Sequence, residues 1–343
     1  MNHHITETDR VFSVRVPMWH GLGEVWSEYP TIEEARERVL NWEPIPEPIY
    51  RKTPIITETG ELAEVYTEVW GSKLVTRSDN AVELGVVNSG FELVKNAEMF
   101  DIIDALEAGN RGNAPIKLET GGSLKGGRKV FLLARLEEPI KVTGDPNGDT
   151  IQYYALQNSH DGSGAFRGQA LNTRIVCDNT SRWADFEAKR RGTEFVFRHT
   201  KNIKDRIEEA QTALAGWRES INAWSEMVEV LVKTPVTEEQ RKDFIELFIP
   251  MPKSETLITD RVRNNVLTAR GSMQELFESK TLEGISHTAY GLVQAGIEWG
   301  QHVRATKGKT DRERLENRFS RAYLDNSELN QTAVKLVKML VNV

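Results

Sequence analysis

Cysteine is almost absent from this chain of 343 residues, which contains only Cys177. A single cysteine cannot form an intramolecular disulfide, and no Cys₂His₂ or Cys₄ spacing is present, so disulfides and structural zinc are not expected. No run of apolar residues approaches the ~18 that a membrane-spanning helix needs, and Met1 to Arg10 lacks the apolar stretch of a secretory signal. The sequence therefore predicts a cytoplasmic protein with no membrane partner, no metal and no cofactor.

Basic residues do not outnumber acidic residues in this chain. The chain has 44 lysines and arginines against 51 acidic residues, a net charge of −7, which disfavours a simple basic nucleic-acid-binding protein. The charge is unevenly distributed, however: it is −11 over residues 1–110, +6 over residues 111–206 and −2 over residues 207–343. A basic middle segment between acidic flanks suggests local attraction to an anion, and a solvated surface is the alternative.

Strands are predicted for much of the first 200 residues. Thr31-Ile-Glu-Glu34 has the form of a capping box and predicts a short helix through about Trp42, ended by the prolines that follow. Turns at Gly71-Ser72 and Asp79-Asn80 then separate three strands of an antiparallel meander, at 65–69, 73–76 and 82–87. Asn96 is the expected cap of a helix through Ala108. Further strands are expected at 130–136, 151–157, 169–177 and 194–198.

A helical period replaces this pattern from about Lys201. Apolar residues recur at alternating steps of 4 and 3 from Ile203 to Leu231, which predicts a helix of roughly 30 residues with coiled-coil-like packing. Its partner is either another helix of the same chain or a second copy in a homo-oligomer. More helices are expected at 237–248, 258–279, 285–304, 310–324 and 326–341.

These patterns predict an α+β fold. We expect an N-terminal arm over residues 1–30 and an antiparallel, strand-rich domain with one or two helices over residues 31–200. A C-terminal helical region containing the long heptad-patterned helix is expected over residues 201–343.

A glycine-rich segment, Thr120 to Lys129, is the first candidate site. Its glycines would let the backbone approach a phosphate, and Lys125, Arg128 and Lys129 would add positive charge. It is not a P-loop, because Arg128-Lys129 replaces the required Lys-Ser/Thr pair and no strand-to-helix context surrounds it. The segment is either a flexible hairpin tip or a loop that grips a nucleic-acid backbone.

Basic and aromatic residues interleave in a second candidate site. Single-stranded nucleic acid is bound by this combination, because cations contact the phosphates while rings stack on the bases. The alternative is an ordinary strand whose phenylalanines, Phe195 and Phe197, face inward. The candidate residues are Arg182, Trp183, Lys189, Arg190, Arg191, Arg198 and Lys201.

A catalytic site is not indicated by spacing. His20, His160 with Asp161, Cys177 and His199 are scattered over 180 residues, and Cys177 ends an apolar strand pattern typical of a buried, inert thiol. We assign no catalytic residue. An enzyme would become attractive if Cys177 or Asp161 lay within about 3 Å of one of these histidines in a pocket.

Several motifs resemble a family of phage- and plasmid-borne proteins known as "domain of unknown function 932". They are Trp19–Gly23, Leu84–Val87, Phe91–Val94, Gly121–Arg128, Asn158–Gly162, Arg174–Asn179, Arg198–Thr200 and His287–Gly291, and the likeness extends from about residue 15 to the C-terminus. The resemblance implies a bacteriophage or mobile-element setting, and hence a bacterial cytoplasm. It implies no established activity.

The leading functional prediction is a phage DNA-metabolism protein that binds single-stranded nucleic acid, and specifically DNA, and promotes strand annealing. The order of hairpins, helix and further strands is loosely similar to the strand-annealing recombinase superfamily, a comparison of architecture alone. The alternative is an interaction or structural factor that captures a host protein through its acidic N-terminal third. Trp19–Gly23 fits neither function directly: it docks either into the core or onto a neighbouring protomer.

Overall fold

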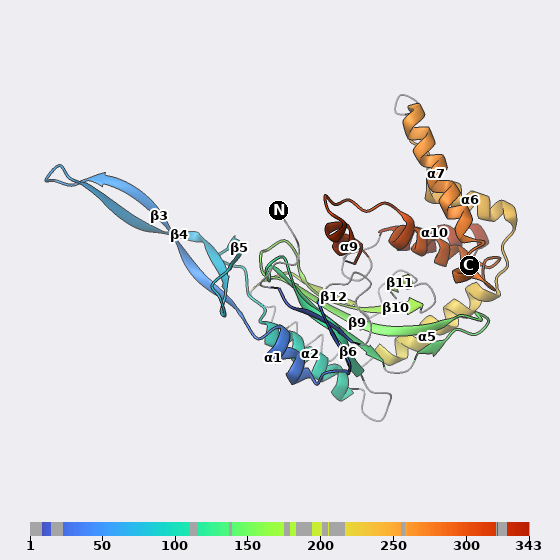
Figure 1. Cartoon of the computed structure of the whole chain (residues 1–343), viewed down its shortest axis with the longest axis horizontal. Helices are drawn as coiled ribbons and strands as arrows, with labels where there is room; N and C mark the ends of the chain where they lie inside the picture. The colour runs from blue at the N-terminus through green and yellow to red at the C-terminus, as the bar shows by residue number, and fades with distance from the viewer. Residues whose placement is uncertain are drawn as a thin grey trace. The chain divides into compact units, whose positions relative to one another are not determined.

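A computed structural model describes residues 9–14, 23–109, 116–136, 139–174, 179–182, 194–200, 205, 217–254, 258–319, 321 and 328–342 (Figure 1). Strands dominate its N-terminal part and helices its C-terminal part, which confirms the predicted α+β class. The chain forms two compact units. Unit 1 comprises Met1–Ala134, Leu156–Gly168 and Phe195–Ala215, and unit 2 comprises Arg135–Ala155, Gln169–Glu194 and Gly216–Val343. The predicted domain boundaries at 30 and 200 stay a prediction.

The first helix of unit 1, α1 (Ile32–Val39), begins at the predicted capping box. Thr31 Oγ1 accepts from the Glu34 amide at 3.1 Å, and the Glu34 carboxylate accepts from the Thr31 amide at 2.8 Å. Ala35 and Val39 form the buried side of α1, which packs on α2 (Asn96–Gly109) and β6 (Ile116–Leu124). The helix ends three residues before the predicted Trp42.

A three-stranded antiparallel sheet follows α1, in the order β3 (Pro44–Ile56), β4 (Leu62–Arg77) and β5 (Glu83–Asn88). The predicted turn at Asp79-Asn80 is confirmed, with Asn80 Oδ1 accepting from the Val82 amide. The predicted turn at Gly71-Ser72 is wrong, because both residues lie inside β4. The turn between β3 and β4 is at Thr57–Glu61 instead, where the Thr57 amide donates to the Glu61 carbonyl at 2.9 Å.

The two long strands β3 and β4 continue well beyond the end of β5 (Figure 1). We call residues 50–70 the ribbon, because along this stretch β4 pairs only with β3 among the described residues. Most side chains on both faces of the ribbon are exposed. Alternation of apolar residues correctly indicated strands here, but it did not reveal that neither face is covered.

A larger sheet has the strand order β11-β10-β9-β7-β6-β1-β2, with β12 paired to β10 and β8 paired to β9. The pairing of β1 with β2 is parallel, and that of β1 with β6 is antiparallel. Strands are found at the predicted 130–136, 151–157 and 194–198, and the strand predicted at 169–177 is confirmed as far as Arg174, since residues 175–178 lie outside the described residues. Strands β1, β2, β6, β8 and β11 were not predicted. The remaining bounds are β1 (Val11–Val14), β2 (Glu24–Trp26), β7 (Lys129–Leu136), β8 (Ile140–Lys141), β9 (Asp149–Ser159), β10 (Phe166–Arg174), β11 (Asn179–Arg182) and β12 (Glu194–Phe197).

Unit 2 is assembled around a fully buried helix, α8 (Ala289–Glu298). Helices occupy the predicted C-terminal ranges as far as the described residues extend, and α8 packs on four helices: α5 (Trp217–Lys233), α6 (Glu238–Phe248), α7 (Asp260–Leu276) and α10 (Glu328–Val341). Gly296 allows this packing, since a Cβ there would lie 2.9 Å from Ala333 Cβ of α10 and 3.2 Å from the Phe244 ring of α6. A π-helical turn (Trp299–Val303) extends α8, and α9 (Asp311–Phe319) follows it.

The heptad-patterned helix is described only from Trp217 onward, as α5. Its seam residues Trp224, Val228 and Leu231 are buried, and α5 contacts α8 of the same chain. Residues 203–204 and 206–216 of the predicted seam lie outside the described residues, so oligomerisation through this helix stays a prediction. Within the described part of the chain, no helix combines the length and apolar character needed to cross a membrane.

Candidate functional site

A buried polar cluster in unit 1 joins elements that are distant in the sequence. We use the name polar cluster for Trp42, Arg77, Asn96 and His160, whose exposed fractions are all 4% or less. Trp42 lies two residues before β3, Arg77 ends β4, Asn96 begins α2, and His160 follows β9. Burial of four polar side chains is costly unless they are paired, so their mutual contacts define how this part of the unit is held together.

The hydrogen bonds of Asn96 fix the protonation of His160. Asn96 Nδ2 donates to the Trp42 carbonyl at 2.7 Å, which directs Asn96 Oδ1 toward His160 Nε2 at 3.0 Å. Because a carbonyl oxygen can only accept, His160 Nε2 carries the proton and Nδ1 is left with a lone pair. That Nδ1 atom is buried and has no hydrogen-bond partner among the described residues.

The pKa of His160 is lowered to about 3, chiefly by burial and also by the nearby His199 and Arg77, against an opposing effect of Asp161. The imidazole is therefore neutral across the physiological range. Its ring also packs edge-on against the Trp42 indole, with ring centroids 5.6 Å apart. A neutral, fully buried imidazole with one nitrogen already bonded to Asn96 is a structural group.

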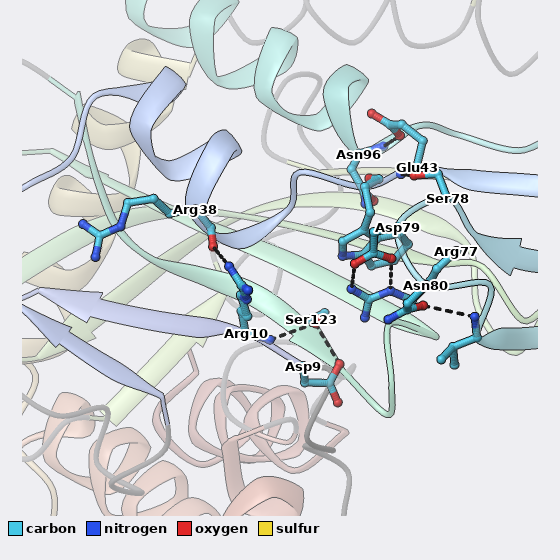
Figure 2. Close-up of polar contacts among 12 residues, drawn as sticks. Asp9, Arg10, Arg38, Glu43, Arg77, Ser78, Asp79, Asn80, Asn96 and Ser123 are labelled. Carbon is cyan, nitrogen blue, oxygen red and sulfur yellow. Dashed lines mark hydrogen bonds and ion pairs between the residues drawn. The ribbon is translucent and has the colours of Figure 1, made fainter.

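Arg77 contacts Trp42 within the polar cluster and pairs with Asp79 outside it. Its guanidinium lies over the Trp42 ring, 4.2 Å from the centroid, and donates two hydrogen bonds to Asp79, at 2.9 and 2.7 Å (Figure 2). The Arg77 side chain is only 4% exposed, and bidentate pairing with a carboxylate compensates for the burial of its charge. The base of the β3–β4–β5 sheet is thus attached to the cluster.

The N-terminus of α2 is capped by Glu43 rather than by Asn96. The Glu43 carboxylate accepts from the Asn96 amide at 2.6 Å and from the Ala97 amide at 3.0 Å (Figure 2). Burial raises the pKa of Glu43, and the two backbone hydrogen bonds oppose this shift. The side chain of Asn96 does not form the predicted cap, because its carboxamide group is hydrogen-bonded to the Trp42 carbonyl and to His160. A cap from a residue 53 positions earlier leaves no local sequence signal.

His199 lies beside the cluster and is also neutral. Its Nδ1 is 2.7 Å from the Glu92 carbonyl oxygen, so Nδ1 donates, and its ring stacks on Phe91 with centroids 4.2 Å apart. Burial lowers the pKa of His199, and the hydrogen bond to Glu92 partly offsets that shift. His199 in turn contributes to the lowered pKa of His160, which places the two imidazoles in the same neighbourhood.

The glycine-rich segment forms a packed hairpin, with Thr120 to Leu124 in β6 and Lys125 to Arg128 in the turn to β7. The Asp9 carboxylate accepts from the Gly126 amide at 2.7 Å and from Ser123 Oγ at 2.7 Å. Gly127 has φ +95°, and a Cβ there would lie 2.9 Å from the Trp42 ring. The segment is therefore a hairpin whose tip is packed rather than flexible, and its Gly126 amide is already bonded to Asp9. Contact of its basic side chains with nucleic acid stays a prediction.

Only part of the predicted nucleic-acid site falls within the described residues. Arg128 and Arg198 are exposed, and Lys125 and Lys129 are half-buried. Arg128 and Arg198 both lie next to the polar cluster. The His160 amide donates to the Arg128 carbonyl at 2.8 Å, and Arg198 directly precedes His199. Arg182 lies in β11, in the other unit, and its side chain is outside the described part. Trp183, Lys189, Arg190, Arg191 and Lys201 also lie outside the described residues.

A catalytic site would require Cys177 or Asp161 within hydrogen-bonding distance of one of the histidines named above, and the described residues form no such pair. Asp161 accepts from Ser159 Oγ at 2.6 Å and from the Ser163 amide at 2.9 Å, within its own loop. These bonds outweigh burial and lower the pKa of Asp161. His20 and Cys177 lie outside the described part of the chain. Within that part, no group of three His, Cys, Asp or Glu side chains could hold a metal ion.

Four of the eight motifs that carry the family resemblance meet in this region of unit 1. Leu84 is buried in β5, and a Cβ at the adjacent Gly85 would lie 3.0 Å from Asp161. Val94 accepts through its carbonyl from Asn158 Nδ2 at 3.1 Å. Together with the hydrogen bonds and ring contacts of His160 and His199, these contacts bring four separated motifs to one neighbourhood: Leu84–Val87, Phe91–Val94, Asn158–Gly162 and Arg198–Thr200.

Comparison with known proteins gives one family match. No curated protein and no solved structure matches the chain. The family model described as "Domain of unknown function (DUF932)" matches residues 83–322, more than two thirds of the chain. The match begins at the first residue of β5, so the ribbon and Trp19–Gly23 precede it. The chain therefore belongs to the family of domain of unknown function 932.

Proposed function

We propose that this protein binds single-stranded nucleic acid, with DNA as the ligand, through basic side chains that surround the polar cluster. The observation that carries the proposal is the position of two exposed arginines. Arg128 is joined to His160 through the backbone, and Arg198 precedes His199, so both are anchored to the same buried framework. A rigid framework reduces the conformational entropy lost when side chains contact phosphates.

The binding groups are side chains rather than the glycine-rich backbone. The Gly126 amide is already bonded to Asp9, whereas Arg128 is exposed and Lys129 is half-buried beside it. Cations that contact phosphates displace condensed counterions, so this mode of binding depends strongly on salt. The net charge of +6 over residues 111–206 favours an anionic ligand for this segment despite the overall charge of −7.

We further propose that the protein promotes strand annealing and that it does so in a bacteriophage setting. This proposal is supported by the β3–β4–β5 meander followed by α2, the order of elements on which the comparison with strand-annealing recombinases rests. Annealing requires no catalytic residue: the protein holds the backbone, leaves base edges free to pair, and aligns protomers along the strand. Under this proposal the protein acts in the bacterial cytoplasm.

The test is the salt dependence of binding to a fluorescein-labelled 30-nucleotide oligothymidylate, measured by anisotropy. Reversing Arg128, Lys129 and Arg198 to glutamate should weaken binding and reduce the slope of log K against log salt by about 2, at ~0.7 per phosphate contact on a single strand. A control variant with the same change in net charge reverses the exposed Lys141, Lys242 and Lys253. No binding by the wild type at low salt, or equal losses in both variants, would contradict the proposal.

A second candidate function, capture of a basic protein by the acidic N-terminal third, is favoured by the ribbon. The ribbon has four glutamates against two basic residues, Arg51 and Lys52 in β3, and no lysine or arginine lies between Thr53 and Ser72. The same stretch exposes large apolar side chains, including Tyr66 at 60% and Trp70 at 80%. Exposed aromatic residues combined with one sign of charge are typical of protein-interaction surfaces.

A further inference from the structure

The ribbon has one open edge whose hydrogen-bonding groups can be assigned residue by residue. The Thr57 amide donates to the Glu61 carbonyl, so these residues form a hydrogen-bonded pair at the turn. Hydrogen-bonded and non-hydrogen-bonded pairs alternate along an antiparallel ladder. In the register that pairs Ile55 with Ala63 and Thr53 with Val65, residues 63, 65 and 67 therefore bond to β3. The backbone groups of Leu62, Glu64, Tyr66 and Glu68 point away from β3.

These outward groups have no ladder partner among the described residues. Strand β5 pairs with β4 only from Ser72 to Thr76, and the Ser89 amide donates to the Gly71 carbonyl, which leaves the edge from Leu62 to Trp70 uncovered. No proline interrupts this part of β4. Natural proteins usually protect such edges, because an unpaired row of N–H and C=O groups is a template for another strand.

The opposite edge of the sheet is protected by four prolines: Pro44, Pro46, Pro48 and Pro54. Pro54 pairs with Glu64, a residue that faces outward, so Pro54 also directs its missing N–H away from the ladder. Within the ribbon the outward edge of β3 is interrupted by Pro54, and three further prolines precede it, whereas the outward edge of β4 has no proline, so strand addition is disfavoured on the β3 side.

The open edge also has a defined side-chain pattern. Leu62, Glu64, Tyr66 and Glu68 alternate with the residues that bond to β3, so their side chains share one face. Leu62 is 77% exposed and Tyr66 is 60% exposed. Glu64 pairs with Lys52 at 2.5 Å, an exposed contact of the kind that contributes little to stability. A strand added beside β4 would therefore place its own side chains opposite two carboxylates flanking an aromatic ring.

We propose that the β4 edge of the ribbon binds an extended basic segment of another protein by strand addition. The segment would carry lysine or arginine at two positions four residues apart, opposite Glu64 and Glu68, with an apolar residue between them opposite Tyr66. Main-chain hydrogen bonds to Leu62, Glu64, Tyr66 and Glu68 supply affinity, and the two basic side chains supply specificity. This inference rests on the second candidate function, and the ribbon lies outside the family match.

A second copy of the chain is a less suitable occupant. Pairing two β4 edges would bring Glu64 and Glu68 of both copies together, four glutamates in all, with no basic residue between Leu62 and Ser72 of either strand. Like charges on adjacent strands are destabilising. A basic segment instead neutralises the glutamates as it binds, and it shields the exposed apolar side chains of Leu62 and Tyr66.

The test uses the isotope-labelled full-length chain and the peptide Gly-Lys-Thr-Val-Thr-Lys-Gly, with amide exchange followed by NMR. The peptide should protect the amides of Leu62, Glu64, Tyr66 and Glu68, while those of residues 63, 65 and 67 are already protected by β3. The control peptide has glutamate in place of both lysines and should protect none of them. Equal protection by both peptides, or absence of the alternating pattern, would overturn the proposal.

A matched pair of variants separates the edge N–H from the side chain. Tyr66→Ala keeps the outward N–H, whereas Tyr66→Pro removes it and should weaken peptide binding at least about tenfold further. Equal affinities would reject strand addition. Alternating protection that appears without peptide and rises with protein concentration would assign the edge to a second copy and overturn the proposal. Oligonucleotide binding should be the same in both variants, so its loss would bear on the nucleic-acid proposal alone.

Discussion

Replacing His160 with glutamine should remove much of the sensitivity of unit 1 to mild acid. His160 is fully buried, and its pKa is lowered from 6.5 to about 3 by burial and by His199 and Arg77. As pH falls below 6.5, the unfolded chain binds a proton at this residue and the native chain does not. The stability contributed by the neutral imidazole is therefore complete above pH 6.5 and is lost as the pH falls toward 3.

The magnitude follows from the two pKa values. Between pH 7.5 and pH 5, a residue with an unfolded pKa of 6.5 and a folded pKa of about 3 lowers the free energy of unfolding by about 2 kcal/mol. Glutamine keeps an N–H donor for Asn96 Oδ1 and does not titrate. Between pH 7.5 and pH 5, the free energy of unfolding of the variant should therefore fall by about 2 kcal/mol less than that of the wild type, whatever the variant's stability at pH 7.5.

Urea unfolding at the two pH values, followed by tryptophan fluorescence, measures this difference. His199 also has a lowered pKa, but it is present in both proteins, so its contribution cancels in the comparison. A His199→Gln variant provides the matching control and should retain the part of the pH dependence that belongs to His160. Parallel losses of stability in the wild type and the His160→Gln variant would refute the assignment of a buried neutral imidazole.

Two further predictions concern the same framework. Gly127→Ala should lower the free energy of unfolding by about 1–3 kcal/mol in urea titrations, because the new Cβ would meet the Trp42 ring at a positive φ; an unchanged midpoint would contradict the packing described. Glu43→Ala should cost about 1–2 kcal/mol by leaving two amides at the start of α2 unpaired, and Glu43→Gln, which keeps one acceptor oxygen, should cost less; equal losses would argue against the cap.

Local patterns were sufficient to predict much of the fold. The capping box at Thr31 and the apolar periodicity of the C-terminal region located helices to within a few residues, because the signals for both lie within a few turns. The turn predicted at Gly71-Ser72 failed because glycine and serine are also tolerated inside an exposed strand, where little packing is lost. Prolines 44, 46 and 48 favour an irregular segment by propensity, yet β3 accepts them because it is an edge strand.

The candidate site was harder to predict because its contacts join residues far apart in the sequence. Basic and glycine-rich segments were visible as composition, and exposed Arg128 and Arg198 keep their place in the nucleic-acid proposal. The polar cluster could not be inferred in the same way. Asn96 resembles a local cap, and only the fold brings the carboxylate of Glu43 to its amide and His160 to its side chain.

Chemical-shift mapping of the isotope-labelled protein with a 12-nucleotide oligothymidylate is the most direct test of nucleic-acid binding at this site. We expect the largest shifts in Lys125–Lys129 and Arg198–Thr200, a decrease of these shifts as salt is raised, and no shifts in the ribbon. Shifts concentrated on residues 50–70, or no shifts at low salt, would contradict the claim that cations anchored beside the polar cluster bind single-stranded nucleic acid.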